Sequence, residues 1–304
     1  MDVAVFSDIH GNHAALQACF DYCVGKGITN YVCLGDYISD CPFPQKTMQL
    51  VHVLKQYFNT RFIRGNREEY MLSYRKNGAT GWMNGSASGA LLYTYENLTD
   101  DDFNLFSKMP IYGIFEEPGI AKFEYCHGSP TASNEVLIRD KRNTKRVLAN
   151  LKTDYLVHGH YHVQESYYYR NKRSINPGSV GLPWMHDGKT QFCILHGDGK
   201  TWEEENIQLD YDRYSILDEF ESSGLLERAP AWSAVTMHTI RTGVDLNETI
   251  QLIAMRLCEK ETGTCVWPDI PEKYWAEALK MNGIDLTGRP IKELVDKPDK
   301  APVT

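Results

Sequence analysis

Near its start the chain reads Val3-Ala4-Val5-Phe6-Ser7-Asp8-Ile9-His10-Gly11-Asn12. The apolar run 3–7 predicts a buried β-strand, and the pattern of residues 12–24 predicts a helix that ends near two glycines. The same rhythm continues with a predicted strand at 31–34, a helix at 44–58 and a strand at 61–64. Strands that alternate with helices predict an α/β fold with parallel strands and right-handed crossovers.

The pattern changes twice further along the chain. A helical insertion is predicted over residues 68–109, and strands return at 112–115, 122–126 and 155–157. Residues 164–209 alternate strands and turns, which indicates a second, more antiparallel sheet. Beyond residue 211 the predicted elements are helices, at 215–222, 246–260 and 272–281. We therefore expect one domain over residues 1–210 and a helical C-terminal appendage over 211–304, which either covers a cleft or forms a dimer contact.

Composition narrows the class of partner and the compartment. The 304 residues include 42% hydrophobic residues, and the net charge of −8 argues against a broad basic surface for long nucleic acids. No apolar run approaches the ~18 residues of a membrane span, and the N-terminus lacks the pattern of a secretory signal. Eight cysteines without a CxxC pair favour reduced thiols. We expect a cytoplasmic protein without a membrane partner.

Polar residues recur where the predicted strands end. The carboxyl ends of strands in open α/β sheets form the ligand crevice, so these residues are expected to converge. They comprise two carboxylates, one amide and four imidazoles, which exceed the needs of one tetrahedral ion and suit two. Imidazole-rich sites favour manganese, iron, zinc, cobalt or nickel over magnesium or calcium. The expected cofactor is a pair of divalent transition-metal ions, with manganese favoured. The predicted metal ligands are Asp8, His10, Asp36, Asn66, His127, His160 and His162.

These motifs, in their order, resemble the signature of the calcineurin-like metallophosphoesterases: Asp8-x-His10, Gly35-Asp36, Gly65-Asn66, His127-Gly128 and Gly159-His160-x-His162. The stretches 7–12 and 176–181 resemble the small bacterial and archaeal phosphodiesterase branch of that family. The resemblance covers about residues 1–210. It implies a four-layer α/β sandwich of two mixed β-sheets flanked by helices, followed here by the helical appendage.

The resemblance also implies roles for the predicted ligands. One metal is bound by Asp8, His10, Asp36 and His162, and the other by Asp36, Asn66, His127 and His160, with Asp36 as the bridge. Metal binding lowers the pKa of water from about 16 towards about 7, so metal-bound hydroxide is available to attack phosphorus. The implied activity is hydrolysis of a phosphodiester or a nucleotide phosphoanhydride, with Asp36, Asn66 and Arg67 as catalytic residues.

Arg67 departs from many family members, which have a histidine after the Gly-Asn pair that is read as the leaving-group acid. A guanidinium does not donate its proton during turnover, but it pairs with phosphate oxygens. Arg67 is therefore predicted to bind substrate, and the alternative is a plain surface arginine. Asn12 either contacts phosphate or caps the following helix. Asp40 lies four residues after Asp36, not three as in the protein phosphatases, so it is given no role, and protein phosphatase activity is not expected.

Two alternatives to this function stay open at this point. The first is a diadenosine-polyphosphate hydrolase, which the same resemblance permits. The second is a non-catalytic metal-binding scaffold for protein interactions, although such a scaffold is expected to have lost ligands. The expected partner is a small phosphorylated substrate, with a nucleotide as one option, and a homo-oligomer is left open.

Overall fold

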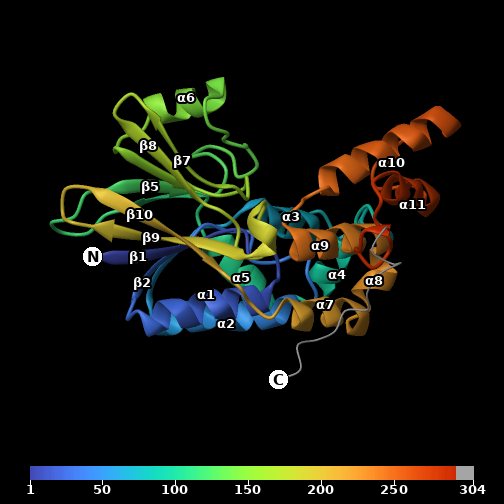
Figure 1. The fold of residues 1–304 in the computed structure, drawn as a ribbon, viewed down its shortest axis with the longest axis horizontal. Helices are drawn as coiled ribbons and strands as arrows, with labels where there is room; N and C mark the ends of the chain where they lie inside the picture. Colours follow the sequence, from blue (N-terminus) through green and yellow to red (C-terminus); the bar gives the residue numbers. More distant parts are fainter. Residues whose placement is uncertain (292–304) are drawn as a thin grey trace.

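Two five-stranded sheets pack face to face in residues 1–291, the part of the chain that the computed structural model describes (Figure 1). The first sheet has the order β10-β9-β1-β2-β3 and the second the order β4-β5-β6-β8-β7. Each combines parallel and antiparallel pairs. The strands of the first sheet are β1 (Asp2–Phe6), β2 (Asn30–Cys33), β3 (Asn59–Phe62), β9 (Thr190–Gly197) and β10 (Trp202–Leu209). Those of the second are β4 (Tyr112–Phe115), β5 (Phe123–Cys126), β6 (Tyr155–His158), β7 (Gln164–Tyr169) and β8 (Lys172–Pro177).

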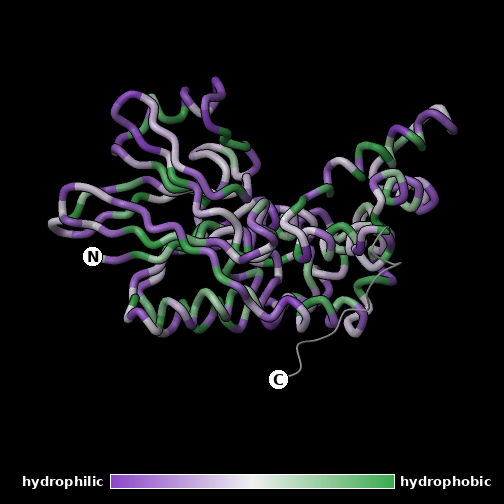
Figure 2. The backbone as a smooth tube through the Cα atoms, in the orientation of Figure 1, coloured by the Kyte–Doolittle hydropathy of each residue, from purple (hydrophilic) through white to green (hydrophobic). Residues whose placement is uncertain are grey.

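Helices cover the outer face of each sheet. The first sheet packs against α1 (His13–Gly25), α2 (Pro44–Tyr57) and α5 (Asp100–Lys108), and the second against α6 (Arg142–Ala149). Figure 1 shows the layers in order from α6 at the top to α1 and α2 at the bottom. In Figure 2 hydrophobic and hydrophilic stretches alternate along α1 and α2, as expected for helices with one face on a sheet. The prediction of an α/β sandwich of two mixed sheets flanked by helices is confirmed.

Strand β1 is buried on both of its faces. Val3 and Val5 point into the core between the two sheets, whereas Ala4 and Phe6 point into the core under the helices. A parallel strand in this position reads as a continuous apolar run and not as an alternating one. The opening sequence therefore specifies a central strand.

The strand register brings the predicted motifs to one edge. Phe6 pairs with Cys33, and Cys33 pairs with Phe62, so β1, β2 and β3 end in line. In the second sheet Cys126 of β5 pairs with His158 of β6. Every one of the predicted metal ligands follows one of these five strand ends within a few residues.

The helical insertion packs against the C-terminal helices outside the two sheets, through an apolar cluster and a pair of hydrogen bonds. α3 (Asn66–Lys76) and α4 (Gly89–Glu96) precede α5, and Tyr93 of α4 shares a buried cluster with Phe220 and Ile240. The backbone N–H and hydroxyl of Ser86 both donate to the Glu272 carboxylate at 2.6 Å. The C-terminal helices are α7 (Arg213–Ser222), α8 (Leu225–Arg228), α9 (Pro230–Thr242), α10 (Asn247–Thr262) and α11 (Glu272–Met281), on the right of Figure 1. The rest of the expected appendage, residues 292–304, lies outside the described residues, and the boundary at residue 211 stays a prediction.

The structure differs from the sequence-based prediction of helices and strands at three elements. β3 lies at Asn59–Phe62 and not at 61–64, and α8 and α9 were not predicted. In α9 every residue from Ser233 to Ile240 is buried, so the helix has no polar face to generate an amphipathic period. α8 has only four residues, too few for any period.

The membrane and cysteine predictions can also be compared with the structure. Within residues 1–291 no helix has both the length and the apolar character that a membrane crossing requires. All eight cysteines are free, and seven of them are buried. Burial raises the pKa of the Cys19 thiol to about 12 and so keeps it protonated. The expected reduced thiols are thus present.

Two glycines allow the loops after β2 and β3 to touch through their backbones. Gly35 has φ +95°, and a Cβ on it would lie 2.2 Å from the backbone nitrogen of Gly65. A Cβ on Gly65 would lie 2.2 Å from Oδ1 of Asp36. Any side chain at either position would therefore separate the loops that carry Asp36 and Asn66.

We predict that Gly35→Ala lowers the free energy of unfolding by about 2–5 kcal/mol, because it adds a left-handed backbone penalty to an overpacked contact. Urea unfolding followed by circular dichroism measures the change. Gly25→Ala is the matched control, since a Cβ there has no neighbour within 4 Å and no positive φ opposes it. We expect that control to shift stability by less than about 1 kcal/mol. Equal effects of the two substitutions would contradict the packing account.

Candidate metal centre

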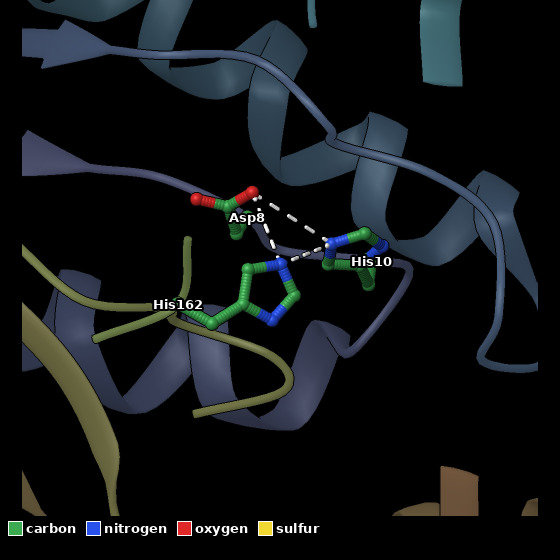
Figure 3. A group of neighbouring side chains, drawn as sticks. All are labelled: Asp8, His10 and His162. Carbon is green, nitrogen blue, oxygen red and sulfur yellow. Dashed lines mark hydrogen bonds and ion pairs between the residues drawn. The ribbon is translucent and has the colours of Figure 1, made fainter. Parts of the chain in front are cut away.

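Two groups of potential metal ligands lie at the strand ends. The first consists of Asp8, His10 and His162, whose ligand atoms all lie within 4.8 Å of one another. Figure 3 shows the three side chains pointing toward a common centre, with Nε2 of His162 3.2 Å from Oδ1 of Asp8 and 3.1 Å from Nε2 of His10. Residues 8 and 10 follow β1 and residue 162 follows β6, so the two sheets build this group together.

The second group consists of Asp36, His127 and His160, also within 4.8 Å of one another. Nε2 of His127 lies 3.3 Å from Oδ2 of Asp36 and 3.1 Å from Oδ1 of Asn66. The amide oxygen of Asn66 is thus the fourth oxygen or nitrogen atom in this group. All seven predicted ligands are brought together by the structure.

Hydrogen bonds at the Nδ1 atoms of three imidazoles direct their Nε2 atoms toward the other ligands. Nδ1 of His127 lies 2.8 Å from the carbonyl oxygen of Leu34, and Nδ1 of His162 lies 2.8 Å from that of Leu182. Nδ1 of His10 lies 2.8 Å from the Asp40 carboxylate. A carbonyl or carboxylate on Nδ1 fixes the tautomer that leaves Nε2 as the metal ligand.

The electrostatics of the centre call for bound cations. Oδ1 of Asp8 is buried and has no hydrogen-bond partner among the described residues, although it faces both ligand groups. Burial opposes ionisation, yet nearby imidazoles hold the pKa of Asp36 at about 2, with His127 first among them. The same carboxylates, against the effect of burial, raise the pKa of His127 to about 9. The buried Asp36 carboxylate thus favours a proton on His127, and divalent ions at these nitrogens and oxygens meet the same need for positive charge.

The backbone is strained at most of the predicted ligands. Five of them have φ between 51° and 68°, in the left-handed region that costs about 1–3 kcal/mol for a side-chain-bearing residue: Asp8, His10, Asp36, His160 and His162. The loops after β1 and β2 hold one another in this geometry. The backbone N–H of His10 donates to the carbonyl of Asp36 at 2.9 Å, and that of Gly11 donates to the carbonyl of Tyr37 at 3.0 Å. The strain is therefore located where the direction of the ligands matters.

The loop 176–181, one of the stretches that carry the family resemblance, holds the backbone of Asp8. The hydroxyl of Ser179 donates to the Asp8 carbonyl at 2.7 Å, and the N–H of Gly181 donates to the same oxygen at 3.0 Å. A Cβ on Gly181 would lie 1.8 Å from the carbonyl oxygen of Ile9. The loop thus fixes the backbone that carries Asp8.

Asp40 is a site residue that the sequence analysis set aside. Its carboxylate is buried and binds Nδ1 of His10, Nη2 of Arg67 at 3.1 Å and Nε1 of Trp232 at 2.7 Å. Although burial opposes ionisation, Arg67 and His10 hold the pKa of this carboxyl well below its usual range. Positive φ at Ser39 and Asp40 turns the chain back toward His10. Spacing alone did not reveal the residue because its position depends on this turn.

Glu68 is a second residue that was missed. It is fully buried, and its carboxylate accepts from the N–H groups of Asp36, Tyr37 and Gly65 at 2.8–2.9 Å. It therefore fastens the loop after β2 to the start of α3. Burial raises its pKa to about 7, and the charge of Asp36 adds to this. The sequence does contain a signal, since an acid three residues after Gly65 fits the half of a capping box in which the N3 side chain accepts from the N-cap N–H.

Of the two predicted substrate-binding residues, Arg67 lies beside the metal ligands, whereas Asn12 is buried in structural hydrogen bonds. The Arg67 side chain is 19% exposed and reaches the carboxylate of Asp40 beside the metal ligands. Asn12 is fully buried: Oδ1 accepts from the N–H of Ala15 at 3.1 Å, and Nδ2 donates to the Gly181 carbonyl at 2.9 Å. Asn12 thus caps α1 and holds the loop 176–181. Contact of Asn12 with a phosphate stays a prediction that these bonds do not favour.

The N-terminal two-thirds of the chain is similar to a known protein family. Residues 1–200 match the model of the calcineurin-like phosphoesterase superfamily domain. The chain belongs to this family. The resemblance carried by the strand-end motifs is confirmed, and the matched region contains all seven predicted metal ligands of the phosphoesterase domain.

Individual relatives share this fold over most of the chain. An uncharacterised protein of Methanocaldococcus jannaschii is 25% identical over 247 residues, which are 76% of this chain and 94% of the relative. The crystal structure of a hypothetical protein of Pyrococcus horikoshii has a TM-score of 0.67 at 21% identity and covers 80% of this chain and 99% of its own. A metallophosphoesterase of Sphaerobacter thermophilus has a TM-score of 0.62 at 19% identity, with 80% and 100% covered. These two structures show that the phosphoesterase fold is shared.

We predict that Asp40→Asn weakens binding of manganese by about 10- to 100-fold, because His10 loses the carboxylate that orients it and raises its basicity. Isothermal titration of metal-free protein with manganese measures the affinity. Asp21→Asn is the control, since Asp21 is an exposed carboxylate on α1. Unchanged manganese affinity in Asp40→Asn would show that the bond to His10 has no influence on the metal.

Proposed function

We propose that the protein is a two-metal hydrolase that cleaves a phosphodiester or a nucleotide phosphoanhydride. The contact between the two ligand groups carries this proposal. Nε2 of His10 lies 3.8 Å from Oδ2 of Asp36, and Nε2 of His127 lies 3.7 Å from Oδ1 of Asp8. Each aspartate thus faces imidazoles of both groups. This spacing supports two neighbouring ions that share a carboxylate, in preference to two independent sites.

The ligand assignment follows the two groups. Asp8, His10, Asp36 and His162 hold one ion, and Asp36, Asn66, His127 and His160 hold the other, with manganese as the favoured metal. When bound, two divalent ions supply positive charge for the phosphate and a hydroxide nucleophile at neutral pH. The protein contributes buried, pre-oriented ligands, so little reorganisation is needed when the phosphate arrives.

Arg67 supplies the contact to the substrate. Its guanidinium lies next to the metal ligands, its side chain is 19% exposed, and its Nη2 atom binds Asp40. It can therefore donate to a phosphate oxygen while it keeps its bond to Asp40. Because Arg67 does not release a proton, it gives no acid assistance to a departing alkoxide. This favours substrates with good leaving groups, such as aryl phosphodiesters and nucleotide anhydrides.

We predict that the protein binds about two manganese ions per chain and hydrolyses bis-p-nitrophenyl phosphate when they are bound. Asp36→Asn is expected to lower metal content and to reduce activity by at least about 100-fold, since the shared carboxylate is lost. Elemental analysis and nitrophenolate release measure the two effects, with Asp21→Asn as the control. A wild-type protein that holds two ions yet cleaves nothing in a broad panel of phosphate esters would contradict catalysis and favour the scaffold.

A leaving-group series tests the part played by Arg67. We expect alkyl phosphoesters to react about 100- to 10,000-fold more slowly than nitrophenyl esters, the range that a missing general acid explains. Arg67→His is expected to narrow this ratio by offering a proton, whereas Arg67→Lys keeps a positive charge and leaves the ratio wide. Rates measured under saturating manganese give the comparison. Similar rates for alkyl and nitrophenyl esters in the wild type would show that another group acts as the acid.

A further inference from the structure

A cavity of about 570 Å³ opens beside the metal centre. It is lined by Arg67 and Asp40, by residues of α3, α4 and the segment between them, and by three residues of the C-terminal region: Trp232 on α9, Gln251 on α10 and Trp267 in the segment between α10 and α11. Its volume lies within the range of about 300–1,000 Å³ typical of sites for small organic ligands. The cavity thus continues from the metal centre into the part of the protein outside the sandwich.

Aromatic rings form much of the wall. Tyr74 and Trp82 stack on each other, with ring centroids 3.8 Å apart and planes 5° from parallel. Within residues 1–291 neither Trp232 nor Trp267 is paired with another ring, and Trp267 is 40% exposed. Trp267 therefore offers an exposed indole on which a planar ligand can stack, whereas Trp232 packs against two apolar clusters and lines the cavity beside Asp40.

The polar groups of the wall are uncharged away from the metal centre. Arg67 and Asp40 are the charged residues among those lining the cavity, and the charge of Asp40 is matched by its bonds to Arg67 and His10. Elsewhere the lining offers amides and hydroxyls, including Asn77, Thr80 and Gln251. A second anionic group therefore has no cationic partner in the cavity, whereas a neutral ring with donors and acceptors along its edge does find partners.

We propose that this cavity binds the nucleobase of a nucleotide substrate whose phosphate lies between Arg67 and the metal centre. This inference rests on the proposed function and narrows its substrate class. Stacking on indole faces recognises any base through its π-face, and amide side chains recognise the hydrogen-bonding edge. A purely aliphatic or sugar substituent leaves the indole faces unstacked. The C-terminal region is thereby assigned a role, because it supplies Trp267 as the stacking residue.

The test compares ligands that differ only in the base. The four common nucleoside 5′-monophosphates and ribose 5-phosphate are titrated into the full-length, manganese-loaded protein by calorimetry, with a phosphate assay to verify that they stay intact. We expect at least one nucleotide to bind 10-fold or more tightly than ribose 5-phosphate, consistent with the order of magnitude of one stacking contact. If all four bind no more tightly than ribose 5-phosphate, the proposal is overturned.

Variants of Trp267 locate the base. Trp267→Ala is expected to reduce the nucleotide preference over ribose 5-phosphate by about 5- to 100-fold, whereas Trp267→Phe keeps most of it. Tyr57→Ala is the matched control, because Tyr57 is an aromatic residue that is 68% exposed on α2. A preference that survives Trp267→Ala unchanged overturns the assignment to this cavity.

The two proposals fail in distinguishable ways. A protein that hydrolyses bis-p-nitrophenyl phosphate but binds nucleotides no better than ribose 5-phosphate keeps the proposed function and loses the base site. A protein that hydrolyses no ester yet shows the Trp267-dependent preference keeps the base site and loses the proposed catalysis.

Discussion

Carboxylates from Asp8, Asp36 and Asp40 lie buried around the imidazole of His10, and the need to balance their charge shapes the surrounding structure. An ionised carboxyl group removed from water is stable only with cations or donors at hand. Protein donors satisfy part of this need: Arg67 and Trp232 bind Asp40, and the backbone N–H of Arg67 donates to Asp36 at 2.8 Å. Oδ1 of Asp8 has no such donor among the described residues. The remaining negative charge is what makes this point in the fold a place for metal ions.

This concentration of charge is possible because the chain can be brought unusually close to itself. Gly35 and Gly65 let two loops meet at backbone distance, and Gly181 lets a third loop meet Ile9. The carboxylate of Glu68 then fastens two of these loops through three N–H groups. Left-handed backbone at the ligands is tolerated since each strained residue is hydrogen-bonded to a residue of another loop. Rigid packing of the sandwich therefore supports a local geometry that an isolated loop would not keep.

Much of this arrangement is predictable from sequence, for identifiable reasons. β1 is predictable from its apolar run. The motif residues directly follow strand ends, so the sheet topology predicts that they converge. Asp40 was not predicted as a site residue because its position depends on a turn with positive φ at two residues, which the spacing of residues in the sequence does not reveal. α9 was not predicted because it is buried on all sides and so lacks the polar face that gives an amphipathic helix its hydrophobic periodicity. Local pattern thus predicts ligands attached to strands better than it predicts contacts made through loops or fully buried helices.

Asp40 also explains why the helices beyond the sandwich concern the chemistry. Its carboxylate touches His10 on one side and Trp232 of α9 on the other, and Arg67 lies against the same oxygen as His10. One side chain thereby joins a predicted metal ligand, the guanidinium that we propose binds phosphate, and the wall of the cavity. Because these contacts share one carboxylate, a ligand that moves Trp232 or Arg67 alters the hydrogen bonding of Asp40, and with it the orientation of His10. In the proposed function, substrate recognition and metal geometry are then parts of the same hydrogen-bonded network, which α9 joins through the bond between Trp232 and Asp40.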